Sequence, residues 1–359
     1  MNTVVIAPEQ LTRFAADLFT AVGVPTPDAR GVAEYLVEAD LRGVRSHGVA
    51  RLPVYLRRLE QGIVKTPPEI KVREAAPAAV HVDGDNGLGF IVARRAMNEA
   101  IDRAEAFGVA VAAVFNSNHF GIAANYLQQA LDAGLAAMVL TNAPPAMAVW
   151  GGKKPLLGTN PIGLAMPGGD SPLMLDMATS TVAKGKIRRA ANQGETIPTG
   201  WALDEYGQPT TDAAAALRGV VLPLGGAKGS GLALMVDALS GVVSGAAFGG
   251  EVGNQNIDFE APQNVGHFFM VFRPDLFLPA GDFAVRMNEL VARIRGCPRA
   301  DGFEAVLVPG EPEAMAAEIA RRDGLVFARK DLDELNGWAG KFGIEMQKFT
   351  SVDRAPNSL

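Results

Sequence analysis

The sequence predicts a mixed α/β fold that is not the Rossmann fold. Apolar runs of strand length, such as residues 109–115 and 266–272, alternate along the chain with segments of helical periodicity such as residues 91–107. No Gly-x-Gly-x-x-Gly sequence opens a helix, so the fingerprint of a standard dinucleotide-binding Rossmann domain is missing. We therefore expect an α/β protein with a different architecture around its sheet.

Composition narrows the class of protein. The 359 residues are 48% apolar, enough for a large core, and their net charge of −6 shows no basic excess, which argues against a nucleic-acid partner. The one cysteine, Cys297, excludes an internal disulfide framework and a cysteine-rich metal site. The amino-terminal residues lack the apolar core of a signal peptide, and no apolar run approaches the length of a membrane span. We expect a cytoplasmic globular protein with no membrane segment.

The elements are predicted in chain order. Residues 7–37 form two helices, residues 54–62 form a third, and residues 65–68 are a linker that marks a domain boundary near residue 66. Strands are expected at 69–72, 78–82, 109–115, 136–140, 173–175 and 266–272, with a short extended segment at 325–328. Further helices are expected at 91–107, 127–131, 183–191, 232–243, 283–295, 312–323 and 332–342. Residues 150–163 form a long polar loop, residues 199–209 an exposed hairpin or loop, and residues 347–359 a loose tail.

The stretch 42–52, Arg-Gly-Val-Arg-Ser-His-Gly-Val-Ala-Arg-Leu, is the first candidate site. His47 is a group that transfers protons near neutral pH, and Arg51 is one that binds a carboxylate through two parallel hydrogen bonds. If the segment from Ser46 is helical, His47, Arg51 and Tyr55 share one face, although Pro53 complicates that geometry. The alternative is that His47 caps a helix and that the arginines are solvated or paired with surface acids.

A second polar cluster follows the predicted strand 109–115. Asn118, His119 and Gly121 stand where this strand gives way to a helix, and ligands of α/β proteins tend to bind at such strand ends. The alternative is a helix N-cap with a histidine that serves only the structure. His267, at the edge of the predicted strand 266–272, is interpreted as structural.

Two further segments have the composition of a phosphate-binding or ribose-binding site. Residues 176–181 combine a carboxylate, which is able to fix the tautomer of a histidine, with hydroxyl groups at a helix start; the alternative is an acidic N-cap. Residues 223–231 resemble a phosphate-binding loop in composition, but their spacing does not match the P-loop. The four histidines show no metal-ligand spacing and no Gly-x-Ser-x-Gly occurs, which disfavours a metal site and a nucleophile-elbow hydrolase.

Six motifs occur in order within residues 5–345. They are the stretch 42–52, Ser-Asn-His-Phe-Gly at 117–121, Gly-Thr-Asn-Pro at 158–161, Leu-Asp-Met-Ala-Thr-Ser at 175–180, Ala-Lys-Gly-Lys at 183–186 and Pro-Leu-Gly-Gly-Ala-Lys-Gly-Ser-Gly-Leu at 223–232. Together they resemble the malate/L-lactate dehydrogenase family of NAD(P)-dependent oxidoreductases. The resemblance implies a non-Rossmann dinucleotide-binding fold with a mixed central sheet and a helical domain formed by both chain ends. Residues 1–66 are then expected to pack with residues 285–346, and residues 67–284 to bind cofactor and substrate.

The resemblance also implies roles for individual residues. His47 is the expected proton donor or acceptor, oriented by Asp176, and Arg51 is expected to bind the substrate carboxylate beside Ser46. His119, near the nicotinamide, is the alternative acid or base. The residues expected at the cofactor are His119, Gly121, Thr159, Asn160, Pro161, Asp176, Met177, Ala178, Thr179, Ser180, Lys184, Lys228, Gly229, Gly310, Glu311 and Pro312, and Thr159 is also expected at the substrate.

The expected activity is hydride transfer between NAD(P)H and a 2-oxo or 2-hydroxy acid of the malate, lactate or sulfolactate type. The alternatives are reduction of a cyclic imino acid such as Δ1-piperideine-2-carboxylate, a hydrolase or lyase that uses Ser46 and His47, and a non-catalytic nicotinamide-binding protein. The choice between NAD and NADP stays open, because Arg188 and Arg189 are either ligands of a 2′-phosphate or solvated. The resemblance further implies a homodimer in which each site is completed across the subunit interface.

Overall fold

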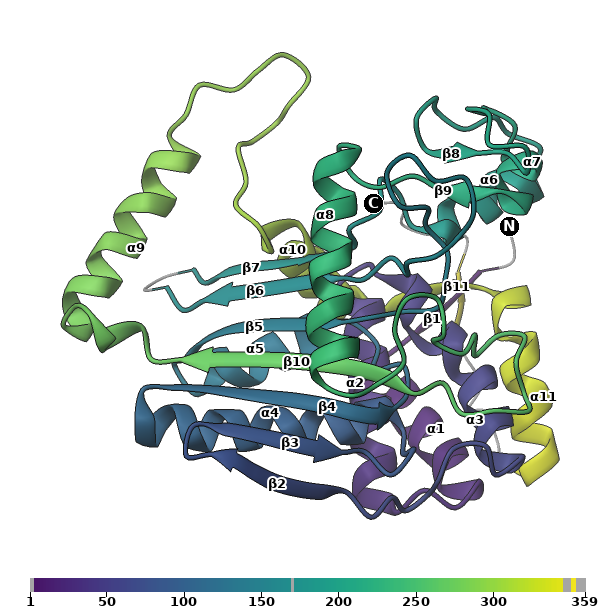
Figure 1. The fold of residues 1–359 in the computed structure, drawn as a ribbon. Coiled ribbons are helices and arrows are strands. Elements are labelled where there is room, and N and C mark those ends of the chain that lie inside the picture. Colours follow the sequence, from purple (N-terminus) through teal and green to yellow (C-terminus); the bar gives the residue numbers. More distant parts are fainter. Residues whose placement is uncertain (1–2, 169–170, 345–349, 353–359) are drawn as a thin grey trace.

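The computed structural model describes residues 3–168, 171–344 and 350–352, and its central element is a seven-stranded sheet (Figure 1). The strand order is β2-β3-β4-β10-β5-β6-β7. The strands are β2 (Lys71–Ala76), β3 (Ala79–Asp83), β4 (Val109–Ser117), β10 (Val265–Phe272), β5 (Ala136–Thr141), β6 (Ile162–Met166) and β7 (Leu173–Met177). β3 and β4 pair in parallel, and the other neighbouring strands pair antiparallel. The predicted mixed α/β class is confirmed.

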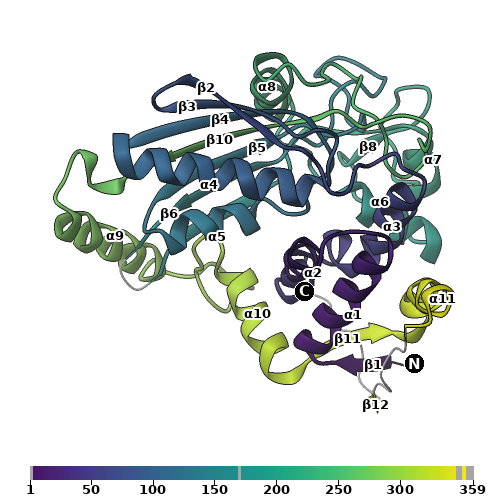
Figure 2. The same ribbon diagram turned by 90° about the horizontal axis from the view of Figure 1, so that it is seen from below.

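Helices cover both faces of this sheet. Figure 2 shows α4 (Gly89–Phe107) and α5 (Ala124–Asp132) on one face, and α8 (Ala227–Asp237) with the π-helical turn η3 (Ala238–Val243) on the other. α4 buries Val92, Ala96, Met97 and Ala100, whose spacing of three or four residues places them on one side of the helix. The helix ends at Gly108, which has a φ of 87°, a left-handed conformation that glycine adopts without steric cost.

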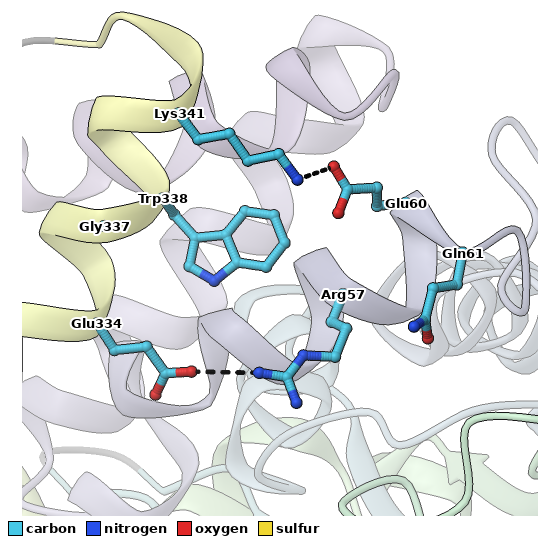
Figure 3. A pocket seen from close by; sticks show the side chains of 7 residues that line it. All are labelled: Arg57, Glu60, Gln61, Glu334, Gly337, Trp338 and Lys341. Atoms are coloured by element: carbon cyan, nitrogen blue, oxygen red, sulfur yellow. Dashed lines mark hydrogen bonds and ion pairs between the residues drawn. The ribbon is translucent and has the colours of Figure 1, made fainter.

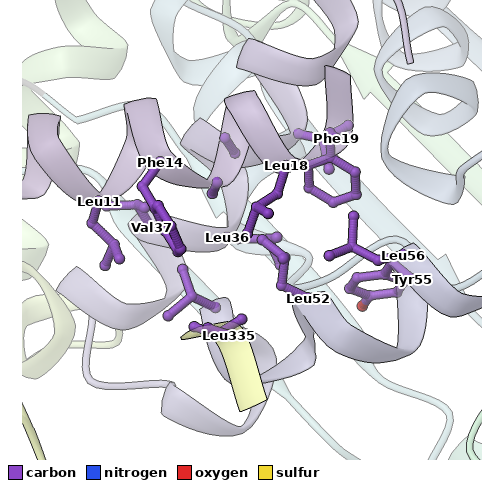
Figure 4. Close-up of a cluster of buried hydrophobic side chains, with 14 of the residues drawn as sticks. Leu11, Phe14, Leu18, Phe19, Leu36, Val37, Leu52, Tyr55, Leu56 and Leu335 are labelled. Atoms are coloured by element: carbon purple, nitrogen blue, oxygen red, sulfur yellow. The ribbon is translucent and has the colours of Figure 1, made fainter. Parts of the chain in front are cut away.

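Residues from both ends of the described chain pack together in a hydrophobic core of their own. It contains α1 (Pro8–Ala21), α2 (Thr26–Leu41) and α3 (Leu52–Glu60) from the amino-terminal part, and α10 (Glu311–Asp323), β11 (Leu325–Ala328) and α11 (Asp333–Phe342) from the carboxy-terminal part. Leu11, Phe14, Leu36, Leu52 and Leu335 are among its buried side chains (Figure 4). α9 (Ala280–Arg295) lies apart from these helices, beyond the end of β10 (Figure 1).

Several strands lie where the sequence pattern predicted loops or nothing. β1 (Thr3–Ile6) pairs with β11 and with β12 (Thr350–Val352), so three residues of the expected loose tail form a strand; the other residues of that expectation lie outside the described ones. A smaller unit holds α6 (Lys184–Gln193), β8 (Ala202–Leu203), α7 (Ala213–Arg218) and β9 (Val220–Val221). β8 lies within residues 199–209, where a hairpin or loop was expected, and it pairs with β9 further along the chain.

α8 begins five residues before its predicted start, at Ala227 instead of Leu232. Lys228 and Gly229 therefore belong to the first helical turn and not to a loop that precedes it. In the described part of the chain, every helix is too short or too polar to cross a membrane.

Candidate active site

The stretch 42–52 is not one helix. It forms two short 3-10 turns, Arg45–His47 and Val49–Arg51, and α3 starts only at Leu52, with Pro53 in its first turn. Gly48 separates the two turns in an extended conformation. The buried Asp40 carboxylate accepts a hydrogen bond of 2.8 Å from the Val49 N–H, so a contact with α2 fixes the turn. The condition for a shared helical face, a continuous helix from Ser46, is therefore not met.

Two histidines nevertheless come together at this turn. The imidazole rings of His47 and His119 are stacked, with centroids 5.4 Å apart and an angle of 23° between their planes. The Tyr55 hydroxyl lies 2.7 Å from His119 Nδ1, and Ser46 Oγ lies 2.9 Å from His47 Nδ1. The contacts thus bring together α3, the turn before it and the segment after β4.

The hydrogen bonds around His119 define which ring nitrogen carries its proton. The Gly121 N–H donates to His119 Nδ1 at 3.3 Å, so Nδ1 is an acceptor and the Tyr55 hydroxyl donates to it as well. In the neutral ring the proton is then on Nε2. Burial, followed by the charges of Arg51 and His47, holds the pKa of His119 well below its usual value of 6.5. At neutral pH this side chain is a neutral hydrogen-bond donor.

His47 is also neutral at neutral pH. Burial and the nearby positive charge of Arg51 lower its pKa to about 4. Because Arg51 is one of the two causes, any anion that binds to Arg51 reduces its effect and raises the pKa of His47. Proton uptake by His47 is therefore coupled to the binding of an acid.

One donor of the Arg51 guanidinium lacks a partner within the described part of the chain. Its Nη1 donates to Asn256 Oδ1 at 2.8 Å, whereas its Nε is buried and has no hydrogen-bond partner among the residues that the structure describes. A buried donor without a partner is costly, and a bound carboxylate is a suitable acceptor for it.

Four of the segments expected at the cofactor are joined to one another by hydrogen bonds. The Ala124 N–H donates to Asp176 Oδ2 at 2.9 Å, which joins the end of β7 to the segment that carries His119. Thr179 Oγ1 donates to the Thr159 carbonyl at 3.0 Å, and the Leu224 N–H donates to the Thr179 carbonyl at 2.9 Å. Residues 119–124, 159–161, 176–181 and 222–229 are thus linked by hydrogen bonds.

The amino-terminal end of α8 suits a negatively charged group. Its N-cap, Gly226, has no side chain to cap the first turn and a φ of 66°. Lys228 is exposed on that turn. The N–H groups of Gly226 and Gly229 bond to the carbonyls of Pro223 and Leu224, so those of Ala227 and Lys228 are the ones that suit an anion. The residues present therefore fit the diphosphate of a dinucleotide, which Lys228 and the N–H groups of the turn would hold.

The other residues expected at the cofactor lie at the starts of two further helices, α6 and α10. Lys184 is at the start of α6, where burial and then Arg188 lower its pKa. Gly310, Glu311 and Pro312 open α10 beside β7, since the Met174 N–H donates to the Pro309 carbonyl at 3.0 Å. The Glu311 carboxylate already pairs with Arg295, so it is engaged within the protein.

Asp176 does not meet His47 among the contacts of the described residues. Its Oδ2 accepts the hydrogen bond from Ala124 at the start of α5, in the manner of a residue that caps a helix. The sequence left both possibilities open, an orienting carboxylate or a cap. The helix start that Asp176 contacts is that of α5, however, and not that of the helix 183–191, for which the sequence pattern offered the cap.

A pocket of about 490 Å³ lies elsewhere, between α3 and α11 (Figure 3). Its lining residues are Arg57, Glu60, Gln61, Glu334, Gly337, Trp338 and Lys341. Arg57 pairs with Glu334 at 3.6 Å, and Lys341 pairs with Glu60, so these charges are satisfied within the protein. None of the histidines lines this pocket, and we do not assign chemistry to it.

Comparison with known proteins defines the class of this enzyme. L-sulfolactate dehydrogenase of Methanocaldococcus jannaschii is 38% identical over 96% of this chain and 99% of the relative. The (2R)-3-sulfolactate dehydrogenase (NADP(+)) of Chromohalobacter salexigens is 42% identical over 76% of this chain and 82% of the relative. The ureidoglycolate dehydrogenase (NAD(+)) of Escherichia coli K12 is 34% identical over 89% and 91%.

Solved structures agree with these relatives. The structure of sulfolactate dehydrogenase from M. jannaschii matches with a TM-score of 0.91 at 38% identity, covering 96% of this chain and 99% of that one. Δ1-piperideine-2-carboxylate reductase from Pseudomonas syringae matches with a TM-score of 0.84 at 31% identity, covering 93% and 99%. This chain is an NAD(P)-dependent dehydrogenase or reductase. It belongs to the malate/L-lactate dehydrogenase family, whose family model matches residues 6–336.

Three further residues contact the histidines or Arg51, and the sequence assigned a role to none of them. Tyr55 was noted for its spacing from His47 and Arg51, and that spacing was the signal for its contact with His119. Asn256 and Gln263 lie in a polar run before a buried strand, a pattern that also fits an ordinary surface loop. Gln263 Oε1 accepts a hydrogen bond of 3.1 Å from the His119 N–H.

Proposed function

We propose that this enzyme interconverts a 2-oxo acid and its 2-hydroxy acid, of the malate, lactate or sulfolactate type. The observation that carries the proposal is the stacked pair of neutral histidines beside an arginine with a free, buried Nε. A carboxylate next to a carbonyl carbon matches this set of groups, because one end of the substrate needs a bidentate cation and the other needs a proton.

In this proposal each residue has one task. Arg51 binds the substrate carboxylate, and the reduced charge around His47 then raises the pKa of that imidazole. His47 gives its proton to the oxygen on C2 as the carbonyl is reduced, and takes it back in the reverse direction. His119 donates a hydrogen bond from Nε2 toward the same oxygen or the nicotinamide. NAD(P)H, when bound, supplies the hydride.

We propose the cofactor-binding surface in the same terms. The segments 159–161, 176–181 and 222–229 flank the histidines, and the first turn of α8 with Lys228 suits the diphosphate. Gly310–Pro312 and Lys184 stand at its margins. Relatives are named for NAD(+) and for NADP(+), so both coenzymes belong in the assay.

Reduction of a cyclic imino acid is the second candidate function. The structural match to Δ1-piperideine-2-carboxylate reductase supports it, and the same residues would protonate a ring nitrogen in place of an oxygen. A panel of 2-oxo acids and cyclic imino acids, assayed with NADH and with NADPH, separates the two. We expect coenzyme oxidation with at least one 2-oxo acid. Turnover of imino acids alone would select the second function, and no turnover in folded, coenzyme-binding protein would contradict both.

We also propose a cytoplasmic homodimer with sites completed across the interface. Support comes from the outer side of α8 and η3, where Leu234, Met235 and Val243 are more than half exposed in the single chain. Contiguous exposed apolar side chains of this kind mark protein interfaces. Sedimentation equilibrium should give twice the chain mass, and a fully active monomer would contradict the proposal.

A further inference from the structure

The segment 253–264 lies against the candidate active site, and hydrogen bonds hold it there. Arg58 of α3 is 1% exposed and donates hydrogen bonds to the carbonyls of Asp258 and Ala261. Gln263 accepts from the His119 N–H and donates to the Gly253 carbonyl at 2.9 Å. The segment is therefore held in a fixed position by buried side chains and backbone groups of the site.

Asn256 is the residue of this segment that contacts Arg51. Its Oδ1 accepts from Arg51 Nη1 at 2.8 Å, and the amide is oriented by Asn254, whose Oδ1 accepts from Asn256 Nδ2 at 3.2 Å and from its N–H at 3.1 Å. Since a guanidinium only donates, the amide oxygen must face Arg51. The orientation of Asn256 is thus defined from both sides.

This contact determines which edge of Arg51 meets a substrate. Asn256 takes one N–H of Nη1, and the edge formed by Nε and Nη2 lies on the side of the guanidinium opposite to Nη1. On that edge Nε is a buried donor without a partner among the described residues. We propose that Asn256 is a positioning residue that aims this edge of Arg51 at the substrate carboxylate. The inference rests on the proposed function of Arg51.

The side chain of Asn256 is uncharged, and this affects how Arg51 binds a substrate. An amide anchors the guanidinium and leaves its positive charge for the substrate, whereas a carboxylate at the same place would pair with Arg51 and compete with the substrate. Asn256 therefore makes the site selective for acids over the corresponding amides or esters. This selectivity is the property that a change at residue 256 should alter.

Asn256→Ala, Asn256→Asp and the control Ile257→Ala test the proposal. Ile257 is the next residue and is 79% exposed, so its replacement changes the same segment without touching Arg51. Steady-state kinetics are measured for the best 2-oxo acid of the wild-type panel and for its amide, together with coenzyme KM and Tm. We expect Asn256→Asp to raise the KM of the acid about tenfold or more and Asn256→Ala by a smaller factor. The KM of the coenzyme, Tm and the Ile257→Ala variant should stay close to wild type.

The outcomes separate this inference from the proposed function. If the wild type turns over the acid and Arg51→Ala raises its KM, but Asn256→Asp leaves that KM unchanged, the role of Asn256 is overturned while the function stands. If Asn256→Asp lowers kcat and Tm with no change in KM, Asn256 serves only the structure. If the wild type reduces no acid, the proposed function fails and the inference fails with it.

Discussion

At the scale of single residues, the account assigns proton transfer to His47 and binding of the acid to Arg51. His47→Ala should lower kcat by about 10²–10⁴-fold, the usual contribution of a general acid or base. Arg51→Ala should raise KM and lower kcat/KM, and Arg51→Lys should recover only part of the loss because a point charge replaces a planar fork. Coenzyme affinity should be nearly unchanged in all three variants. Turnover at the wild-type level in His47→Ala would contradict the assignment.

His119→Ala is the matched control for that assignment. The contacts of its Nδ1 with Tyr55 and Gly121 leave Nε2–H as the donor, so His119 should contribute a hydrogen bond and not the transferred proton. We expect a smaller loss of kcat than in His47→Ala. An equal loss with the same change in pH profile would mean that the two histidines share the task.

Tyr55 provides a second prediction at this scale. Tyr55→Phe removes the hydroxyl that lies 2.7 Å from His119 Nδ1 and leaves the Gly121 N–H as its remaining donor. One neutral hydrogen bond contributes about 1 kcal/mol, so kcat should fall by about three- to tenfold with little change in Tm. Steady-state kinetics and thermal unfolding measure both quantities. An unchanged kcat would show that the hydroxyl does not hold the ring in place.

The sequence predicted the chemical groups of the site better than their arrangement in space. The types and spacing of His47, Arg51 and Tyr55 were sufficient to place them in one candidate site. The continuous helix that would align them on one face does not form, because Gly48 is extended and Asp40 holds the Val49 N–H nine residues further on. The partners of Arg51 and His119 in the segment 253–264 lie about 140 to 200 residues further along the chain, and no local pattern connects them.

Among the elements, the turn that carries His47 depends on a close approach of the Gly48 backbone to the buried Asp40 side chain. A Cβ added to Gly48 would lie 2.2 Å from the Asp40 carboxyl group, a distance that a real side chain does not adopt. Gly48→Ala should therefore displace the turn and lower kcat/KM by about 10²-fold, the size of effect expected from a misplacement of about 1 Å. The far-UV circular dichroism spectrum should stay close to that of the wild type while kcat/KM falls.

Gly281→Ala is the control for this steric argument. An added Cβ at Gly281 meets no described atom within 4 Å, and this glycine lies at the start of α9. We expect unchanged kinetics for Gly281→Ala. Wild-type kcat/KM in Gly48→Ala would show that the turn tolerates the side chain and that its position is not critical.

At the scale of the whole molecule, the buried His267 links stability to pH. Its ring lies 2.8 Å from both Thr141 Oγ1 and Ser117 Oγ, and burial lowers its pKa from 6.5 to about 3. Between these two pH values the unfolded chain binds a proton that the folded chain does not. The free energy of unfolding from this group therefore falls as pH is lowered, by about 1.4 kcal/mol per pH unit.

His267→Gln tests this linkage. Chemical denaturation of wild type and variant between about pH 5 and pH 6.5 gives the two slopes, and the variant should lose stability less steeply. The comparison removes contributions that both proteins share, such as that of Asp40, whose pKa burial raises to about 7 and which acts in the opposite direction. Parallel pH curves for the two proteins would contradict the prediction.

The sheet shows the limit of sequence reasoning at this scale. Six of the seven strands were predicted within a few residues, since alternating buried positions such as Ala110, Ala112 and Val114 repeat along β4. The exception is β6, which begins inside the expected polar loop 150–163. The strand order was not predicted. β10 pairs with both β4 and β5, although it lies more than 120 residues after them in the sequence. Its place depends on packing against both neighbours, which a pattern along the chain does not contain.

The central claim is hydride transfer from a nicotinamide to C2 of an acid, and isotopic labelling tests it most directly. Wild-type protein is given its best 2-oxo acid and NADH or NADPH deuterated at C4, with each of the two C4 positions labelled in turn. We expect one deuterium at C2 of the 2-hydroxy acid from one of the two labelled coenzymes, and none at C2 from D₂O with unlabelled coenzyme. Deuterium at C2 from the solvent, or a reduced acid with none from either coenzyme, would contradict it.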